Sequence, residues 1–428
     1  MLVGVVLLLL QPYPLLHDYP EWMYQGHIAY SLFSGSSEFT TMYELVPLPV
    51  PNAISQTAIA LLNIVVSPVM AGKIWLAVYL VLALLVVWLG TAGHRQHAAK
   101  QLIFLVTIAF GPGFFNGYIN FQFGVLLFAL FVITDARRSS LWVLVFSLVI
   151  YFAHASVFAC FVAYVVFSGV LNQRNVAALL ALVPSLLMLA WYSTSKILQE
   201  PGFNTALTSL KEWVGYKGYT LAKQGPFHNF IMPDGQSLLT DYHAVYLIGF
   251  GINLLVAVLI ALWLLSVIWM MYSKAEILTR PGFHLAALAA TVIVLFILWL
   301  LAGTSSFGVV NIGERFLIVA LMMLLITVRM PRIIALTWAF LCAAMGVVTI
   351  LALVSLSQVP GVYTVARSNA ETELKSFVDD IYGNSRHKYF NHRLFIYANL
   401  GQALHEADPN VAPLPVDHES SIVRMREN

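Results

Sequence analysis

The sequence predicts an all-α integral membrane protein with about eleven transmembrane helices. Of its 428 residues, 60% are hydrophobic and only 10% are charged, and the mean hydropathy is +0.82. A soluble domain carries about 25% charged residues, so this composition excludes that class of protein. The apolar residues also fall in runs separated by short polar or basic connections, a pattern typical of helices that cross a bilayer.

The first apolar run covers residues 2–16 and is short for a span, which normally needs about 20 residues. It has no basic segment before it and no small-residue cleavage site after it, so it does not read as a signal peptide. We expect a first span that begins upstream of Met1 or that lies at a tilted chain end. Residues 17–71 then form a first outer loop, with a surface helix over 22–32 and an interfacial helix over 55–67.

The remaining spans are expected at about 72–92, 101–112, 120–134, 140–153, 156–171, 176–194, 242–270, 284–303, 316–328 and 333–357. Several of these are shorter than a bilayer, which is tolerated only where their ends border protein rather than lipid. The resulting membrane domain covers residues 1–358. It carries a second large outer loop over 195–241 and is followed by a polar C-terminal tail over 359–428.

The basic residues of the short connections set the predicted orientation. If 101–134 and 140–171 are each a hairpin of two short spans, the basic residues of the short connections fall on the cytoplasmic side. The N-terminus is then cytoplasmic and the tail lies outside a bacterial cytoplasmic membrane. A single long helix over 101–134 would instead place Arg137 and Arg138 outside. Residues that do not fit this pattern are Lys73, Arg315 and four lysines of the 195–241 loop.

Two carboxylates follow the first apolar run, in His17-Asp18-Tyr19-Pro20-Glu21-Trp22. Acids at the mouth of a membrane bundle are costly to hold near lipid, which makes them candidate functional residues. Asp18 is the candidate general base, since a partly desolvated carboxylate can take a proton from a hydroxyl. The alternative is a residue that ends the span, with Tyr19 and Trp22 as interfacial anchors. Glu21 is a second candidate acid, or it faces water.

The predicted hairpin turns carry further polar candidates. Asn116 and Asn120 lie in a glycine-rich, aromatic stretch over 113–121, where amides can bind sugar hydroxyls and rings can stack on sugars. The alternative is an ordinary turn with interfacial rings. His154 lies at the second turn, where it is either a binding residue or a satisfied core histidine.

Charged residues near the start of the 316–328 span complete the set. Arg315 can bind a phosphate oxyanion with two hydrogen bonds, or pair with Glu314 at the interface. His228, with the lysines of the second outer loop, can meet an anionic headgroup or a lipid pyrophosphate, or belong to a solvated loop. The lysines are Lys196, Lys211, Lys217 and Lys223.

Other functional classes leave no trace in the sequence. There is no P-loop, dinucleotide fingerprint, HExxH or CxxC motif. No basic cluster with interleaved aromatics suggests nucleic acid as a partner. Cys160 and Cys342 lie in separate apolar runs and read as small core residues.

The acidic residue at the start of a long first outer loop resembles the GT-C-fold membrane glycosyltransferases. In that superfamily this loop carries the catalytic acid, and sugars are transferred from polyprenyl-phosphate carriers on the outer face, commonly with inversion. Asp18 is the matching position. The stretches 116–120, 151–156 and 314–316 are similar, more loosely, to recurrent stretches of bacterial GT-C-like proteins. Two departures are the lack of a second acid directly after Asp18 and of a large repetitive outer domain.

The resemblance implies a glycosyltransferase of the bacterial envelope. Its partners would be a lipid-linked sugar donor, membrane lipids and a glycan, lipid or protein acceptor. Asp18 would be the general base, Arg315 would hold the leaving phosphate, and His154 and Asn120 would position sugar or phosphate. No cofactor is indicated, although a divalent cation, Mg²⁺ or Mn²⁺, is compatible with this chemistry.

Three alternatives remain at this stage. A transporter or flippase of a lipid-linked substrate would need polar or broken helices near the midplane. An O-antigen polymerase or ligase would depend on outer-face Arg and His rather than on Asp18. A scaffold of an envelope complex would need none of these residues for turnover.

Overall fold

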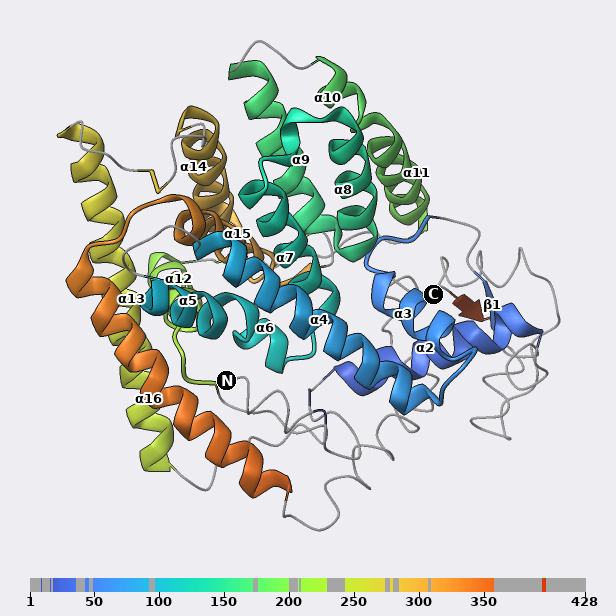
Figure 1. Cartoon of the computed structure of the whole chain (residues 1–428), viewed down its shortest axis with the longest axis horizontal. Helices are drawn as coiled ribbons and strands as arrows, with labels where there is room; N and C mark the ends of the chain where they lie inside the picture. The colour runs from blue at the N-terminus through green and yellow to red at the C-terminus, as the bar shows by residue number, and fades with distance from the viewer. Residues whose placement is uncertain are drawn as a thin grey trace.

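The protein is almost entirely helical in the computed structural model (Figure 1). The only strands among the described residues are two pairs of two to three residues each. The structure describes residues 9, 16, 18–35, 43–45, 49–91, 97–171, 176–199, 207, 209–228, 243–273, 278–279, 285–306, 309–357 and 395–397.

The N-terminal helices form one side of the molecule. Helix α2 (Tyr19–Ser34) begins with a proline in its first turn and ends at Gly35, whose positive φ of 69° suits glycine. It packs against α3 (Ile54–Leu62) and α4 (Pro68–Thr91). The buried Tyr19 hydroxyl donates to the Gly72 carbonyl at 2.7 Å and so joins α2 to α4. The helix expected at 22–32 is confirmed within α2, and that expected at 55–67 is confirmed only as far as Leu62, where α3 ends. Their place at the membrane surface stays a prediction.

The next segment leads into the centre of the bundle. Helix α5 (His97–Ile103) continues into the π-helix η1 (Phe104–Ala109), and the chain then turns through the short α6 (Pro112–Phe115) into α7 (Ile119–Ile133). Thirteen of the fifteen residues of α7 are buried. A short apolar helix with nearly every side chain covered has protein, not lipid, as its solvent.

The third segment turns sharply at a single residue. After the 3-10 turn η2 (Ala136–Arg138), helix α8 (Ser140–Ala153) ends at His154, whose backbone is extended, and α9 (Ala155–Leu171) begins at once. Helices α8 and α9 pack side by side, and α10 (Val176–Leu180) contacts both. Helix α11 (Val183–Gln199) follows and packs on α8. The expected turn at 154–156 is therefore present.

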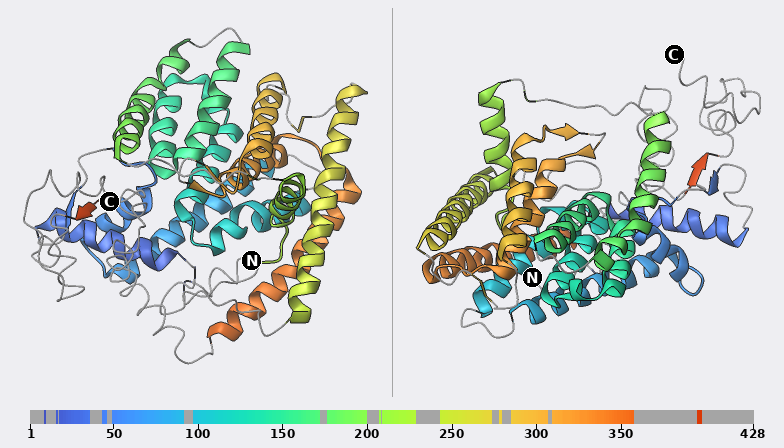
Figure 2. Two further views of the ribbon diagram at one scale, coloured as in Figure 1. Left: turned by 180° about the vertical axis from the view of Figure 1, so that it is seen from behind. Right: turned by 90° about the horizontal axis from the view of Figure 1, so that it is seen from above.

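The second half adds the remaining helices. Helix α12 (Leu210–Ala222) lies in the predicted second outer loop, and α13 (His243–Tyr272) and α16 (Arg332–Ser357) run beside each other at one edge (Figure 2). Helix α14 (Leu285–Leu301) packs closely on α15 (Ile312–Thr327), and the short strands β2 (Ser305–Ser306) and β3 (Val309–Val310) lie between them in the chain. Thirteen of the sixteen residues of α15 are buried, which makes it a central helix like α7.

Buried helix ends are completed by side chains from distant segments. The Lys217 ammonium donates to the Trp299 and Ala302 carbonyls at the C-terminus of α14. The Lys100 ammonium donates to the Val328 carbonyl at 2.7 Å at the C-terminus of α15. The last carbonyls of a helix have no partner within the helix, and a cation there also suits the helix dipole.

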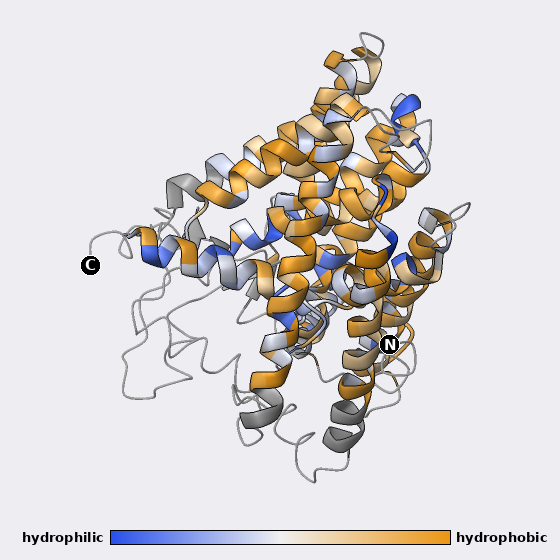
Figure 3. Cartoon of the chain, turned by 90° about the vertical axis from the view of Figure 1, so that its left-hand side faces the viewer, coloured by the Kyte–Doolittle hydropathy of each residue, from blue (hydrophilic) through white to orange (hydrophobic). Residues whose placement is uncertain are grey.

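The chain is a membrane protein by the character of its helices. Four described segments are long and apolar enough to cross a membrane: Pro68–Gly90, Val176–Thr194, Leu247–Tyr272 and Arg332–Ile350. Apolar residues dominate most helices, and hydrophilic residues are confined to short stretches (Figure 3). The short apolar helices α7, α8, α9 and α14 lie where short spans were expected. The count of eleven membrane crossings stays a prediction.

One contact links the first loop to the C-terminal tail. Strand β1 (Tyr43–Leu45) pairs antiparallel with β4 (Phe395–Tyr397), with Glu44 opposite Ile396. The rest of the expected tail over 359–428 lies outside the described residues.

Replacing Lys217 by methionine tests the capping of α14. Because the variant leaves the Trp299 and Ala302 carbonyls without their charged donor, we expect the free energy of unfolding to fall by about 1–3 kcal/mol. Lys211→Met is the matched control, since Lys211 is exposed on the same helix, and we expect a change within about 0.5 kcal/mol. Heat denaturation of the detergent-solubilised protein measures both, and equal effects would contradict the capping role.

Candidate functional site

A charged contact joins two helices at the centre of the candidate site. Arg315, in the first turn of α15, places Nη1 2.7 Å from Nε2 of His154, between α8 and α9. Arg315 Nε is buried and has no hydrogen-bond partner in the part of the chain that the structure describes. The guanidinium therefore retains donor capacity in a place where water is scarce, which suits an anionic ligand.

His154 is contacted at both nitrogens of its ring. Nε2 faces Nη1 of Arg315. Nδ1 accepts from the Ser156 backbone amide at 3.2 Å and lies 2.9 Å from the Ser156 hydroxyl oxygen. His154 is buried, with 7% of its surface exposed. Its role in this arrangement is to position Arg315.

Aromatic rings surround the guanidinium. The Cζ atom of Arg315 lies 5.6 Å from the centroid of the Tyr118 ring and 5.7 Å from that of Phe121. The Phe121 ring also meets His154 edge-on at 5.2 Å. Cation–π contacts of this kind hold a planar guanidinium in a fixed orientation. Three helix N-termini, those of α7, α9 and α15, converge here, and their dipoles add to the attraction for an anion.

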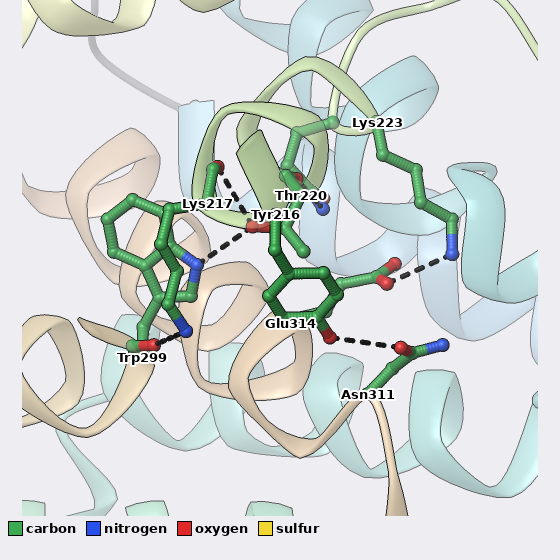
Figure 4. A network of polar contacts seen from close by, with 8 residues as sticks. Tyr216, Lys217, Thr220, Lys223, Trp299, Asn311 and Glu314 are labelled. Atoms are coloured by element: carbon green, nitrogen blue, oxygen red, sulfur yellow. Dashed lines mark hydrogen bonds and ion pairs between the residues drawn. The ribbon is translucent and has the colours of Figure 1, made fainter. Parts of the chain in front are cut away.

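A second cation lies beside the first. The Lys223 ammonium forms an ion pair with the Glu314 carboxylate at 2.9 Å (Figure 4). Burial lowers the pKa of Lys223, but the Glu314 carboxylate outweighs it, so the net pKa is above the ordinary value. Lys223 directly follows helix α12. Lys217 and Tyr216 of α12 bond to Trp299 of α14 and to Asn311, and these contacts fix the position from which Lys223 extends.

Asp18 lies within electrostatic reach of this cluster. Burial raises the pKa of Tyr118, the Asp18 carboxylate raises it further, and the charges of Arg315 and Lys223 oppose them. Burial lowers the pKa of Arg315, and Tyr118, Glu314 and Asp18 oppose this shift. Asp18, Arg315 and Lys223 therefore act on one tyrosine from different segments of the chain.

Gly117 sets the place of Asp18. The Asp18 amide donates to the Asn116 carbonyl at 3.2 Å. Gly117 has a φ of 79°, and a Cβ added there would lie 2.6 Å from the Asp18 amide nitrogen. Only glycine allows both this backbone conformation and this approach of the two chains.

His228 lies within electrostatic reach of Lys223. Burial and the positive charge of Lys223 lower the pKa of His228 from 6.5 to about 3, so the ring is neutral. It is 5% exposed, and its ring packs on Phe115 with centroids 4.9 Å apart. The expected binding of an anionic headgroup by His228 is therefore poorly matched to a neutral imidazole.

The structure gives two expected site residues another use. Asn120 accepts from the Ser55 amide at 2.9 Å and donates to the Asn52 carbonyl, so its side chain ties α7 to the start of α3. Its amide is engaged with the backbone, which argues against the expected positioning of sugar or phosphate. Asn116 contributes its backbone carbonyl to Asp18. Glu21 is in the first turn of α2, and its side chain lies outside the described part of the chain.

Sequence reasoning did not single out Tyr118 or Asn52. Tyr118 was noted only as one ring of the 113–121 stretch, and nothing in its sequence position indicates contact with Arg315. Asn52 accepts from the Ala155 amide at 2.8 Å, at the N-terminus of α9. Across the described ranges, no three His, Cys, Asp or Glu side chains gather as metal ligands do.

Comparison of the chain with protein-family models, with curated proteins and with solved structures found no match. The functional argument therefore rests on the arrangement of these side chains.

The pKa of His228 predicts a pH dependence of stability. The unfolded chain takes up a proton near pH 6.5 and the folded chain only near pH 3. Stability is therefore full above pH 6.5 and falls on acidification, by on the order of 1 kcal/mol per pH unit. His228→Gln removes this component, so its unfolding midpoint should fall less than that of the wild type between pH 7 and pH 4.5. Parallel curves would contradict the prediction.

Proposed function

We propose that the protein is a membrane glycosyltransferase that moves a sugar from a polyprenyl-phosphate carrier to an envelope acceptor. The observation that carries the proposal is the Arg315–His154 contact, with Tyr118 and Asp18 beside it. It combines an oriented donor for a phosphate oxyanion with a nearby carboxylate, inside a bundle of apolar helices. These are the groups that transfer from a lipid phosphate requires.

In the proposed step, the acceptor hydroxyl attacks the anomeric carbon of the donor sugar. Asp18 takes the hydroxyl proton, a new carbon–oxygen bond forms, and the bond from the anomeric carbon to the phosphate oxygen breaks. The electron pair of that bond stays on the polyprenyl phosphate. Arg315 stabilises the charge that develops there, with Lys223 as a second cation within reach of the same cluster. Attack from the face opposite the phosphate inverts the anomeric configuration.

The pairing of β1 with β4 supports the proposed topology. Two strands that share hydrogen bonds lie on one side of a membrane, so an even number of spans must separate residues 45 and 395. Eleven spans, of which one precedes the first loop, leave ten between these residues. A single long helix over 101–134 would leave nine and separate the strands. We therefore propose eleven spans in a GT-C-like bundle, with the first loop and the tail on the outer face of a bacterial cytoplasmic membrane.

One observation favours a second candidate function. An O-antigen polymerase or ligase depends on outer-face arginine and histidine, and Arg315 with His154 is such a pair. Both functions use a polyprenyl-linked donor, and they differ in the need for Asp18. A transporter or flippase of the same lipid stays an alternative without an observation of its own.

Substitution of Asp18 and Arg315 discriminates between the two candidates. For the glycosyltransferase, we expect Asp18→Asn to lower transfer from native lipid-linked sugars at least about 100-fold, the scale of general-base catalysis. Arg315→Gln should weaken transfer in both cases. Glu212→Gln, an exposed carboxylate of α12, is the matched control and should leave transfer unchanged.

The assay measures consumption of lipid-linked sugars by purified, folded protein. Full activity of Asp18→Asn with loss in Arg315→Gln would favour the polymerase or ligase. Absence of sugar transfer by the wild type would argue against both enzymes.

A cysteine pair tests the proposed side of the tail. In Glu44→Cys/Ile396→Cys the two residues face each other across β1 and β4, at a separation that a disulfide can bridge. We expect a disulfide to form in the oxidising space outside the membrane and to appear in mass spectra of non-reduced peptides. Each single variant is a control, and the native Cys160 and Cys342 are buried. Two free thiols in the double variant would contradict the outer location of these strands.

A further inference from the structure

Among the residues that the structure describes, neither ring nitrogen of His228 has a hydrogen-bond partner. Both Nδ1 and Nε2 are buried and make no hydrogen bond, and the residue is 5% exposed. The backbone of Phe110 lies close enough to favour the protonated form slightly but completes no hydrogen bond. A buried polar group without a partner costs about 1–3 kcal/mol, so such a group needs an explanation, and an absent ligand is one.

The backbone beside His228 is held in place by α13. Asn253 accepts from the Phe227 amide and donates to the Phe227 carbonyl, both at 2.9 Å. Gly225 lies so close to Asn253 that a Cβ on Gly225 would be 2.1 Å from the Asn253 side-chain oxygen. These contacts fix the segment before His228 from both sides. The unpartnered imidazole is therefore set in a defined position, as a binding residue must be.

The chemistry of the ring defines what it can bind. A neutral imidazole offers one donor and one acceptor, and two hydroxyl groups can satisfy them, one accepting from the N–H and one donating to the other nitrogen. Its acceptor nitrogen repels a phosphate oxygen, and the Phe115 ring beside it offers an apolar face. A hydrogen-bond donor and an acceptor for hydroxyl groups, placed next to an aromatic ring, are typical of a carbohydrate subsite.

Lys223 connects His228 with the charged groups of the site. Lys223 acts electrostatically on His228 and on Tyr118, and Tyr118 contacts Arg315. The cluster therefore has a cationic half around Arg315, which His154 contacts, and a neutral half with His228 and Phe115. An amphiphile that joins a phosphate to a sugar has the same two parts.

We propose that His228 and Phe115 form a subsite for the sugar of the donor, with the His228 ring nitrogens bound to sugar hydroxyls. The identity of the sugar-bearing ligand as the donor rests on the proposed function. The subsite itself requires only that an uncharged, hydroxyl-bearing ring binds at His228. The cationic half takes the phosphate.

The test uses full-length protein in detergent and two kinds of probe. Saturation-transfer NMR measures binding of a panel of methyl hexosides, which carry no phosphate or lipid. Thermal shift measures binding of farnesyl phosphate, which carries no sugar. We expect His228→Phe to weaken hexoside binding about tenfold, the cost of losing two hydrogen bonds, and to leave farnesyl phosphate binding within about twofold.

Two further variants keep the test sharp. His228→Gln retains one donor and one acceptor, so hexoside binding should stay within about threefold of the wild type. Gln122→Leu is the matched control. The Gln122 side-chain amide, on α7, is also buried without hydrogen-bond partners among the described residues, and it lies close to Gly113 of α6. This variant should bind hexosides as the wild type does, which excludes a general effect of removing a buried polar group.

Several results would overturn the subsite. These are no hexoside binding by the wild type, unchanged hexoside binding by folded His228→Phe, or an equal loss of both probes in that variant. Hexoside binding that depends on His228 without any sugar transfer would support the subsite and argue against the proposed transferase. Transfer by the wild type with hexoside binding independent of His228 would overturn the subsite alone.

Discussion

The constraint that shapes this structure is the need to satisfy the ends of helices that are buried in the bundle. A short helix within a membrane protein ends among other helices, where water cannot complete its last hydrogen bonds. Here Lys217 completes the end of α14 and Lys100 the end of α15. Asn52 and Asn120 do the same for the N-termini of α9 and α3. These polar side chains allow ends of α3, α9, α14 and α15 to lie inside the bundle.

The candidate site consists of the polar groups that do not complete helix ends. Arg315 keeps an unpartnered nitrogen, and both nitrogens of His228 are unpartnered. His154 contacts and orients Arg315, and Glu314 forms an ion pair with Lys223. Since α7, α9 and α15 all present their N-termini here, the site is biased toward anions before any ligand arrives. The neutral His228 is the exception, which is why we assign it an uncharged partner.

The position of Asp18 shows how the fold links distant parts of the sequence. Gly117 lets the 116–118 turn reach the start of α2, and Tyr118 in the same turn lies against Arg315. Three segments, around residues 18, 118 and 315, therefore meet through one turn. The lysine that completes the cluster comes from a fourth, α12, which is held against the ends of α14 and α15.

The sequence by itself determined the membrane character, most helix positions and the residue types at the candidate site. Hydrophobic runs locate helices because burial of apolar side chains depends on local composition. His154, Arg315, Asp18 and His228 were identifiable because polar residues are rare in such runs. Only the tertiary structure decided their roles. Asn120 and Lys217 resemble ligand-binding residues in sequence but complete helix ends, whereas Lys223, six residues after Lys217, joins the cluster. The difference depends on which backbone or charge lies opposite each side chain. That is set by contacts between residues 65 to 161 positions apart, which no local pattern encodes.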